Sequence, residues 1–311
     1  MKAFTATRDE AATVRLSEVP EPQPAADQAL VKVEAYSVNR GETFQLERPP
    51  GDGWRPGKDV AGLVVQAAPD GSGPAVGSRV VGHPPALGWA EYAAVPTGQL
   101  AVLPDRLTVE QAAALPLAGL TALRLLRTAT RHTGHLAGRR VLLTGASGGV
   151  GHYLTELAAA AGARITAVSS SAERGQRLAE LGAVEVVHRV ADAEGPFDLV
   201  LESTGGADLP VALDRLAKRG LLLWFGQASR QPVTLDFFRL LTGPTSATIR
   251  QFSYADVDEP DGADLATLVR LAAEGRLHPE LGTVRDWHGT PEVLAELRGR
   301  RIRGNAVLTI C

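Results

Sequence analysis

The stretch RRVLLTGASGGVGHYLTELAAAAGARITAVS, residues 139–169, decides the fold of this chain. Its apolar run Val141–Leu143 predicts a buried strand, and a glycine-rich turn, Gly145–Gly151, follows at once. A helix then continues to Gly162, and a second apolar strand begins at Arg164. A turn without bulky side chains lets backbone N–H groups and the helix dipole bind a pyrophosphate. Because these glycines lie between a strand and a helix, the stretch predicts a dinucleotide-binding site.

The same alternation of strands and helices continues to about residue 251. A second helix ends at Gly182, a third strand follows, and three further strand-like runs come after it: FDLVLES, LLLWFG and TSATIRQFS. We expect the helix ADLPVALDRLAKRG between the first two of these runs. The pattern predicts an α/β fold with a doubly wound parallel Rossmann sheet in residues 115–251.

The segments on either side of this fold have a different pattern. Residues 1–114 alternate short β-like runs with turn residues, which predicts a small and largely antiparallel β domain. The pattern becomes helical at Thr108, since Thr108 and Gln111 have the spacing of a capping box. Residues 252–311 contain two helical segments and end in a strand-like run. We expect this tail to rejoin the first domain, so that the nucleotide fold is an insertion in it.

The composition excludes several classes of protein. A chain of 311 residues with 44% hydrophobic and 22% charged residues is typical of a globular protein of two domains. A net charge of -3 gives no basic surface for nucleic acid or an anionic membrane. We expect neither a signal peptide nor a membrane span, and hence a cytoplasmic protein. The one cysteine, Cys311, leaves no intrachain disulfide and no multi-cysteine zinc site.

Seven short motifs follow one another along the chain. They are VNRGETF from Val38, PGKDVAG from Pro56, WAEYAAVP from Trp89, LPLAGLTAL from Leu115, TGASGGVG from Thr144, LGAVEVV from Leu181 and RIRGNAVL from Arg301. In this order and spacing the chain resembles the medium-chain dehydrogenases and reductases, in particular the zinc-free quinone oxidoreductases and enoyl reductases. The resemblance implies a GroES-like β-rich catalytic domain and a Rossmann domain, which together hold a nicotinamide cofactor and its substrate.

The resemblance also bears on metal binding. Zinc-dependent relatives use a cysteine and a histidine, because zinc prefers sulfur and nitrogen ligands. This chain has Ser37, Val38 and Asn39 in the first ligand segment, Lys58 at the histidine position and Asp59 beside it. A protonated lysine has no lone pair to give to a metal. We therefore expect no bound metal.

The residues after the second strand of the Rossmann fold indicate the cofactor. Folds that prefer NAD place an acid there, which accepts hydrogen bonds from the ribose 2′-hydroxyl. This chain instead has Ser169, Ser170 and Ser171, followed by Arg174. Hydroxyl donors and a guanidinium suit a 2′-phosphate, so the sequence predicts NADPH. The alternative is that the serines cap the next helix and Arg174 is a solvated surface charge.

The resemblance assigns further cofactor contacts. They are Asn39, Thr121, Gly148, Gly149, Val150, Arg189, Phe225 and Gly226. Arg189 follows the third strand, near the adenosine pocket of relatives, and would add a second phosphate contact. For Thr121 the alternative is a local polar contact in a helix, and for Phe225 it is packing in the core.

Two residues are candidates for catalysis. Asn39 is expected to bind the ribose or the substrate carbonyl, and its alternative role is that of a turn former. Lys58 is expected to stabilise an enolate or phenolate oxygen. Its alternative is a salt bridge to Glu42 or Asp59.

Aromatic residues suggest a substrate pocket. Phe44, Trp54 and Trp89 are expected to form an apolar lid over a flat conjugated substrate, with ordinary packing as the alternative. Phe44 lies where a number of relatives carry a tyrosine, so this position supplies no phenolic proton donor. His83 and Tyr92 are expected to belong to the packing of the β domain.

These features lead to one expected function and two alternatives. The first is an NADPH-dependent oxidoreductase that transfers hydride to a quinone or an α,β-unsaturated carbonyl compound. The others are a biosynthetic cyclase or isomerase and a non-catalytic NADPH-binding protein on the same scaffold. The family commonly pairs through the edge strand of the Rossmann sheet, here TSATIRQ, so a homodimer is expected.

Overall fold

A computed structural model describes residues 1–7, 13–51, 53–257 and 259–310, so that Cys311 lies outside the described residues. The chain forms two compact units. Unit 1 comprises Met1–Leu120 and Asp258–Cys311, and unit 2 comprises Thr121–Val257. The sequence places the boundaries near residues 114 and 251, a few residues before those of the structure. The C-terminal segment is part of unit 1.

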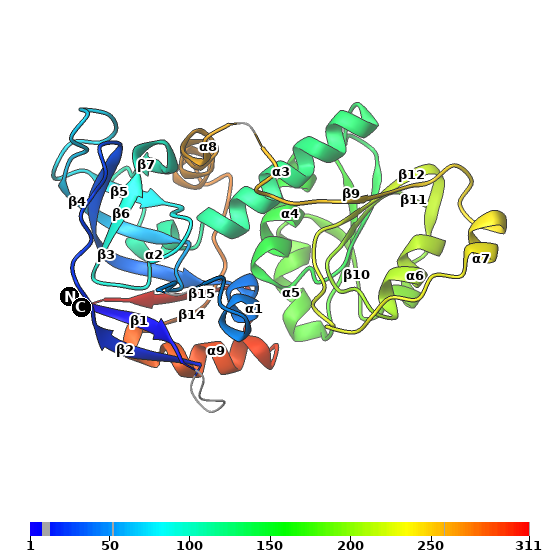
Figure 1. Ribbon diagram of the computed structural model, residues 1–311. Helices are drawn as coiled ribbons and strands as arrows, with labels where there is room; N and C mark the ends of the chain where they lie inside the picture. Colours follow the sequence, from blue (N-terminus) through cyan, green and yellow to red (C-terminus); the bar gives the residue numbers. More distant parts are fainter. Residues whose placement is uncertain (8–12, 52, 258, 311) are drawn as a thin grey trace. The chain divides into compact units, whose positions relative to one another are not determined.

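Unit 1 is built mainly from antiparallel strands (Figure 1). Its elements are β1 (Lys2–Ala6), β2 (Val14–Glu18), β3 (Gln28–Val38), α1 (Arg40–Glu47), β4 (Val60–Gln66), β5 (Arg79–Gly82), β6 (Tyr92–Pro96), η1 (Thr97–Gln99), β7 (Leu100–Val102), α2 (Val109–Ala113), the start of α3 (Pro116–Thr133), α8 (Asp261–Ala273), β14 (Leu281–Asp286), η3 (Trp287–Gly289), α9 (Thr290–Arg298) and β15 (Asn305–Thr309). The larger sheet has the order β14-β15-β3-β4-β5-β7, with β6 also paired to β3. Strands β14 and β15 are parallel, and the other pairs are antiparallel.

Aromatic side chains lie at the centre of the unit 1 core. Tyr36, from β3, stacks on Trp89 with ring centroids 5.6 Å apart, and both side chains are fully buried. Phe4 meets Trp287 edge to face at 5.8 Å. Such pairs contribute roughly 0.5–1.5 kcal/mol beyond the burial of their area. The Tyr36–Trp89 stack holds the end of β3 in place, and this end leads directly into the site described below.

Unit 2 contains one six-stranded parallel sheet. Its elements are the rest of α3, β8 (Arg140–Leu143), α4 (Gly149–Ala160), β9 (Arg164–Val168), α5 (Ala172–Glu180), β10 (Ala183–Val187), η2 (Val190–Asp192), β11 (Phe197–Glu202), α6 (Asp208–Asp214), β12 (Leu216–Trp224), α7 (Phe237–Thr242) and β13 (Thr248–Gln251). The strand order β10-β9-β8-β11-β12-β13 is that of the dinucleotide-binding fold, with β8 as its first strand. The predicted doubly wound sheet is therefore confirmed.

The structure corrects one predicted helix and adds another. The segment ADLPVALDRLAKRG is helical only as far as Asp214, because Leu216 is buried and already pairs with Phe197 of β11. Helix α1, which the sequence analysis does not anticipate, follows β3 at Arg40. The expected capping box is present, since the Gln111 N–H donates to Thr108 Oγ1 at 3.2 Å.

Candidate functional site

The glycine-rich turn joins β8 to α4 in unit 2. Gly145 has a φ of +62°, a conformation that favours glycine. A Cβ at Gly151 would lie 2.3 Å from the carbonyl oxygen of Ala146, so only glycine fits there. The N-cap of α4 is Gly148, which has no side chain to cover the first N–H groups of the helix. Gly149 and Val150 form the first turn, and this helix end has the chemistry that binds an anionic phosphate.

Hydrogen bonds fix the two loops beside this turn. Thr144, at the end of β8, donates from Oγ1 to Glu202 Oε1 at 3.1 Å and accepts from the Ser203 N–H at 2.9 Å. Burial raises the pKa of Glu202, while backbone N–H donors that include Gly205 lower it. After β12, a Cβ at Gly226 would lie 2.9 Å from the Ser203 carbonyl oxygen. The strand ends are therefore held close together by short loops.

The serine run after β9 has divided roles. Ser171 caps α5, since its Oγ accepts a hydrogen bond from the Arg174 N–H at 3.3 Å. Ser169 is buried, and its hydroxyl donates to the Ser171 carbonyl at 3.3 Å, whereas Ser170 is exposed. The Arg174 guanidinium is half-buried, and its Nε donates to Ser147 Oγ at 3.4 Å. This arginine is therefore directed toward the glycine-rich turn rather than into open solvent.

The other predicted cofactor residues of unit 2 differ in exposure and in the contacts they make. Arg189 is exposed and forms two hydrogen bonds to Asp192, of 3.1 and 2.5 Å. These bonds lower the pKa of Asp192. Any phosphate contact of Arg189 has to compete with this ion pair. Thr121 is buried in α3, and Phe225 is half-buried with its N–H bonded to the Glu202 carbonyl at 2.9 Å.

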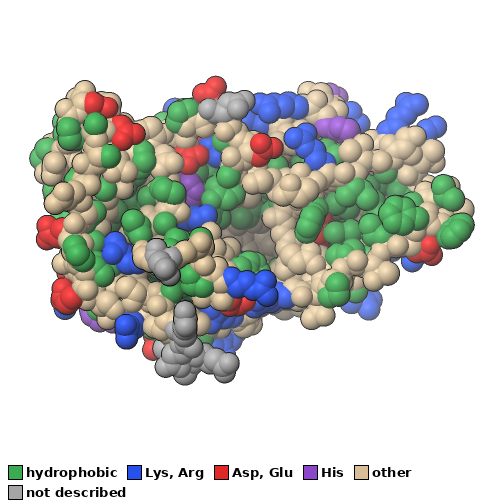
Figure 2. Space-filling model, viewed as in Figure 1, with side chains coloured by type: hydrophobic (Ala, Val, Ile, Leu, Met, Phe, Trp, Pro, Cys, Tyr) green, Lys and Arg blue, Asp and Glu red, His purple; other side chains and the backbone are tan. Residues whose placement is uncertain are grey.

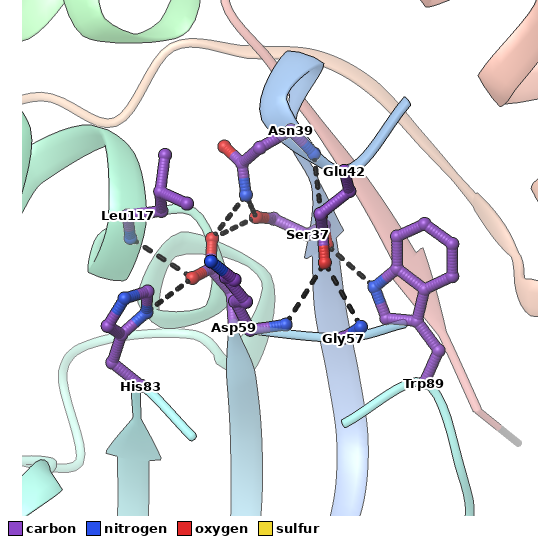
Figure 3. Close-up of polar contacts among 9 residues, drawn as sticks. Ser37, Asn39, Glu42, Gly57, Asp59, His83, Trp89 and Leu117 are labelled. Atoms are coloured by element: carbon purple, nitrogen blue, oxygen red, sulfur yellow. Dashed lines mark hydrogen bonds and ion pairs between the residues drawn. The ribbon is translucent and has the colours of Figure 1, made fainter. Parts of the chain in front are cut away.

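A buried carboxylate, Asp59, connects three segments of unit 1 (Figure 3). Its Oδ1 accepts hydrogen bonds from His83 Nδ1 and from the Leu117 N–H, each of 3.0 Å. Its Oδ2 accepts from Ser37 Oγ at 2.5 Å and from Asn39 Nδ2 at 2.7 Å. Because an ionised carboxylate has no proton to donate, all four groups act as donors toward it.

Asn39 is oriented by this carboxylate. It is the N-cap residue of α1, and its backbone N–H donates to the Glu42 carboxylate as in a capping box, although its own side chain makes no capping hydrogen bond. Instead Nδ2 donates to Asp59 Oδ2 and, at 3.1 Å, to Ser37 Oγ. Figure 3 shows the amide oxygen pointing away from Asp59. Asn39 therefore both begins α1 and directs its amide NH₂ group at Asp59.

Glu42 is a second buried acid beside the first. Its Oε2 accepts from the Asn39 N–H at 3.0 Å, and its Oε1 accepts from the N–H groups of Gly57 and Lys58, each at 3.1 Å (Figure 3). Burial, with the nearby charge of Asp59, raises the pKa of Glu42 to about 8. The backbone donors and the positive charge of Lys58 act in the opposite direction. Glu42 therefore ties α1 to the segment that carries Lys58 and Asp59.

The predicted catalytic lysine and the predicted aromatic lid residues differ in how deeply they are buried. The Lys58 side chain is half-buried, and its positive charge lowers the pKa of Glu42 against the larger effect of burial. Trp89 has an exposed fraction of 0%, and its Nε1 donates to the Ser37 carbonyl at 3.1 Å. The prediction that Trp89 forms part of a lid is wrong, because the side chain belongs to the core. Phe44 is half-buried, and Trp54 is partly buried against that core.

Two kinds of feature are absent from the described chain. No group of three His, Cys, Asp or Glu side chains in the described segments is placed to hold a metal ion. None of the described helices has the length and apolar character needed to cross a membrane.

Two family models match the chain. Residues 25–105 match the alcohol dehydrogenase GroES-like domain, and residues 149–273 match a zinc-binding dehydrogenase model. A quinone oxidoreductase from Mus musculus is 30% identical over 237 residues, which are 71% of this chain and 70% of the relative. One from Pseudomonas aeruginosa is 30% identical over 305 residues, 92% of either chain. This chain belongs to the quinone oxidoreductases of the medium-chain dehydrogenase and reductase superfamily.

Solved structures show the same fold as this quinone oxidoreductase family member. A mycobacterial protein complexed with NADPH has 27% sequence identity and a TM-score of 0.89, and the match covers 99% of this chain and all of that one. The Escherichia coli quinone oxidoreductase complexed with NADPH is 22% identical, with a TM-score of 0.89 over 99% of either chain. The GroES-like domain and the Rossmann domain implied by the sequence motifs are confirmed.

Sequence reasoning missed part of the unit 1 site. It places Asp59 beside the histidine position of zinc-dependent relatives and offers it as a salt-bridge partner of Lys58. It assigns His83 to the packing of the β domain, whereas His83 and Asp59 are bonded to each other. The spacing of Asn39 and Glu42 is that of a helix start, which would have predicted α1. No local signal links His83 to Asp59, because the contact joins residues 24 positions apart.

Glu42 is expected to make the protein less stable as the pH rises from about 5 to about 8. The folded state holds the Glu42 proton more tightly than the unfolded chain, whose pKa is about 4.3. This contribution is complete below the unfolded pKa and is lost as the pH rises through the folded pKa, with a magnitude on the order of a few kcal/mol. Urea unfolding at several pH values checks it: the wild type should lose more stability over this range than Glu42→Gln. Equal slopes would contradict the assignment.

Proposed function

We propose that this quinone oxidoreductase family member transfers hydride from NADPH to a quinone or an α,β-unsaturated carbonyl compound without zinc. The observation that carries the proposal is the Arg174 guanidinium, which faces the glycine-rich turn where the sequence offers no acid after β9. A guanidinium and the exposed Ser170 suit the 2′-phosphate that distinguishes NADPH from NADH. The names of the curated relatives and the NADPH complexes of the related structures support it.

Each unit has residues that suit one end of the cofactor. The start of α4 suits the pyrophosphate, and Asn39 is the candidate for the nicotinamide end. When bound, NADPH supplies the hydride. Lys58 is placed by its backbone bond to Glu42, and its ammonium would stabilise the negative charge that develops on the substrate oxygen. Phe44 and Trp54 remain the candidates for contact with a flat substrate.

Zinc independence is a separate part of the proposal. In the metal-ligand segments of zinc-dependent relatives this chain carries Ser37, Val38 and Asn39, with Lys58 at the histidine position, and the Asn39 Nδ2 donates to Asp59 and Ser37. Protein purified without added metal should contain zinc at well below one equivalent by plasma mass spectrometry, and its activity should survive dialysis against a chelator. Stoichiometric zinc, or loss of activity on dialysis, would contradict this part.

The activity is tested by following the absorbance of NADPH with a panel of quinones and enones. Oxidation of NADPH that depends on the added substrate is the expected result. Conversion of a substrate without net oxidation of NADPH would point instead to a cyclase or isomerase. Binding of NADPH without any conversion across the panel would point to a non-catalytic binding protein.

Lys58→Met is expected to lower kcat by about 10- to 100-fold and to leave the Kd for NADPH unchanged, because it removes the charge that stabilises the oxyanion. Methionine keeps much of the side-chain volume. Lys32→Met provides the control, since Lys32 is an exposed lysine on β3 of the same unit. Full activity of Lys58→Met would remove Lys58 from the mechanism and leave its interaction with Glu42 as its role.

We also propose that two copies of the chain associate through the edge of the unit 2 sheet. In the described chain β13 pairs only with β12, so its other edge has unpaired backbone groups. Helix α7 precedes this strand and exposes large apolar side chains: Phe237 (73%), Phe238 (81%) and Leu241 (81%). Figure 2 shows hydrophobic side chains gathered on the part of unit 2 that carries α7. An exposed apolar surface beside an open strand edge is typical of an interface between identical chains.

The dimer is tested with a charge placed in the exposed apolar surface of α7. Light scattering after size-exclusion chromatography should give a dimer for the wild type and a monomer for the double substitution Phe238→Asp with Leu241→Asp. Val76→Asp provides the control, because Val76 is 62% exposed in unit 1, far along the chain from β13. A monomeric wild type, or a double variant that remains a dimer, would contradict the proposal.

A further inference from the structure

The polarity of the Asn39 side chain is set by the buried network around Asp59. Both oxygens of Asp59 are acceptors, so only the NH₂ group of Asn39 is able to face it. The same Nδ2 also donates to Ser37 Oγ, at 3.1 Å. Asn39 therefore presents its carbonyl oxygen, an acceptor, on the side away from Asp59 (Figure 3).

The partners on the other side of Asp59 prevent this network from reversing. His83 Nδ1 and the Leu117 N–H both point at Oδ1, and the Leu117 group is a backbone donor that has no alternative polarity. Ser37 Oγ donates to Oδ2 while it accepts from Asn39. The carboxylate thus receives donors from four positions, and every side chain in the network has one orientation. His83 and Asp59 are both buried, so solvent does not substitute for these bonds.

We propose that Asp59 is a positioning residue that, with His83, holds Asn39 as a hydrogen-bond acceptor for an O–H or N–H donor at the nicotinamide end of NADPH. The inference rests on the proposed function. NADPH carries two kinds of donor at this end: the ribose hydroxyls and the NH₂ of the carboxamide.

Asp59→Asn reverses the outward polarity of Asn39 without leaving a polar group unsatisfied. The amide that this substitution introduces at position 59 has to turn its oxygen toward His83 and Leu117, which are donors, and its NH₂ toward Ser37 and Asn39. The amide of Asn39 then rotates to accept from that NH₂, and its own NH₂ faces outward. We expect a folded protein in which the outward NH₂ of Asn39 faces the donor group of NADPH. The Kd for NADPH should then rise about tenfold or more.

The double variant Asn39→Asp with Asp59→Asn restores the outward acceptor. The carboxylate at position 39 then accepts from the amide at position 59 and from Ser37 through one oxygen, and its other oxygen faces outward as in the wild type. We expect the Kd for NADPH to return to within about threefold of the wild-type value, given the size of one hydrogen bond. Asn39→Asp alone places two carboxylates against each other, at the 2.7 Å contact, and is expected to weaken both binding and stability.

The experiment measures the Kd for NADPH by fluorescence titration and the stability by thermal unfolding for all four proteins. Loss of affinity in folded Asp59→Asn together with recovery in the double variant supports the inference. If Asp59 acts on stability alone, the folded Asp59→Asn protein should bind NADPH with the wild-type Kd, and this result would overturn the inference. A stable double variant whose Kd does not return toward the wild-type value would overturn it as well. A wild type that fails to bind NADPH would overturn the proposed function as well.

An NADPH analogue with an acetyl group in place of the carboxamide identifies the donor. This analogue has no N–H at that position. If Asn39 accepts from the carboxamide, Asp59→Asn weakens NADPH but not the analogue. If it accepts from a ribose hydroxyl, Asp59→Asn weakens both to the same extent. An analogue and NADPH that both bind the single variant as they bind the wild type would overturn the inference.

Discussion

Replacing Arg174 with alanine is expected to raise the Kd for NADPH by about 10- to 100-fold and to leave the Kd for NADH nearly unchanged, because a hydrogen bond to a charged group contributes roughly 1.5–3 kcal/mol. The guanidinium is held toward the glycine-rich turn by Ser147 and lies on the first turn of α5, next to the end of β9. NADH lacks the phosphate that this charge would bind, so the substitution should change its Kd little.

Arg177→Ala is the matched control for this prediction. Arg177 lies on the same helix and pairs with Glu180 at 2.6 Å, one turn further from the serine run. Its loss should change neither Kd. Arg174→Lys keeps the charge without the planar fork and should fall between the wild type and the alanine variant. Equal losses of NADPH and NADH affinity in Arg174→Ala would show that the residue acts on the fold of the turn and not on the phosphate.

Gly57→Ala is expected to lower the free energy of unfolding by roughly 3–5 kcal/mol, because it combines a forbidden backbone conformation with a clash. Gly57 has a φ of +116°, and a Cβ there would lie 2.2 Å from the backbone nitrogen of Trp89. Backbone atoms have no rotamer by which to move aside. The affected segment carries the N–H groups that hold Glu42 and leads into Lys58 and Asp59, so NADPH affinity and kcat should fall with stability.

Gly71→Ala separates the two causes of this effect. Gly71 also has a positive φ, of +79°, but no atom lies within 4 Å of an added Cβ. Its substitution should cost only about 1–2 kcal/mol, the contribution of the backbone conformation. Tryptophan fluorescence during urea unfolding reports mainly on unit 1, which contains Trp54, Trp89 and Trp287. Equal destabilisation by the two substitutions would mean that the contact with Trp89 does not constrain Gly57.

The sequence by itself determined the parts of this protein that depend on neighbours in the chain. The glycines of the turn are required by backbone geometry within a few residues, so their pattern predicted the β8-turn-α4 unit and the sheet that follows from it. The cap formed by Thr108 and Gln111 is local in the same way. The ion pair of Arg189 with Asp192 joins residues three positions apart and is also local, although the sequence prediction assigned Arg189 to the cofactor.

Only the tertiary structure decided the parts that depend on distant residues. Helix α6 ends at Asp214 because Leu216 pairs with Phe197 of β11, and local helix propensity does not predict this pairing. Trp89 belongs to the core because Tyr36 covers it. The orientation of Asn39 also depends on a distant residue. Its local spacing fits a helix cap, but its NH₂ group donates to Asp59, 20 residues away, and this bond sets the direction of its amide oxygen. The sequence determined which residues reach the site, and long-range hydrogen bonding in a buried network decided which atom each one presents.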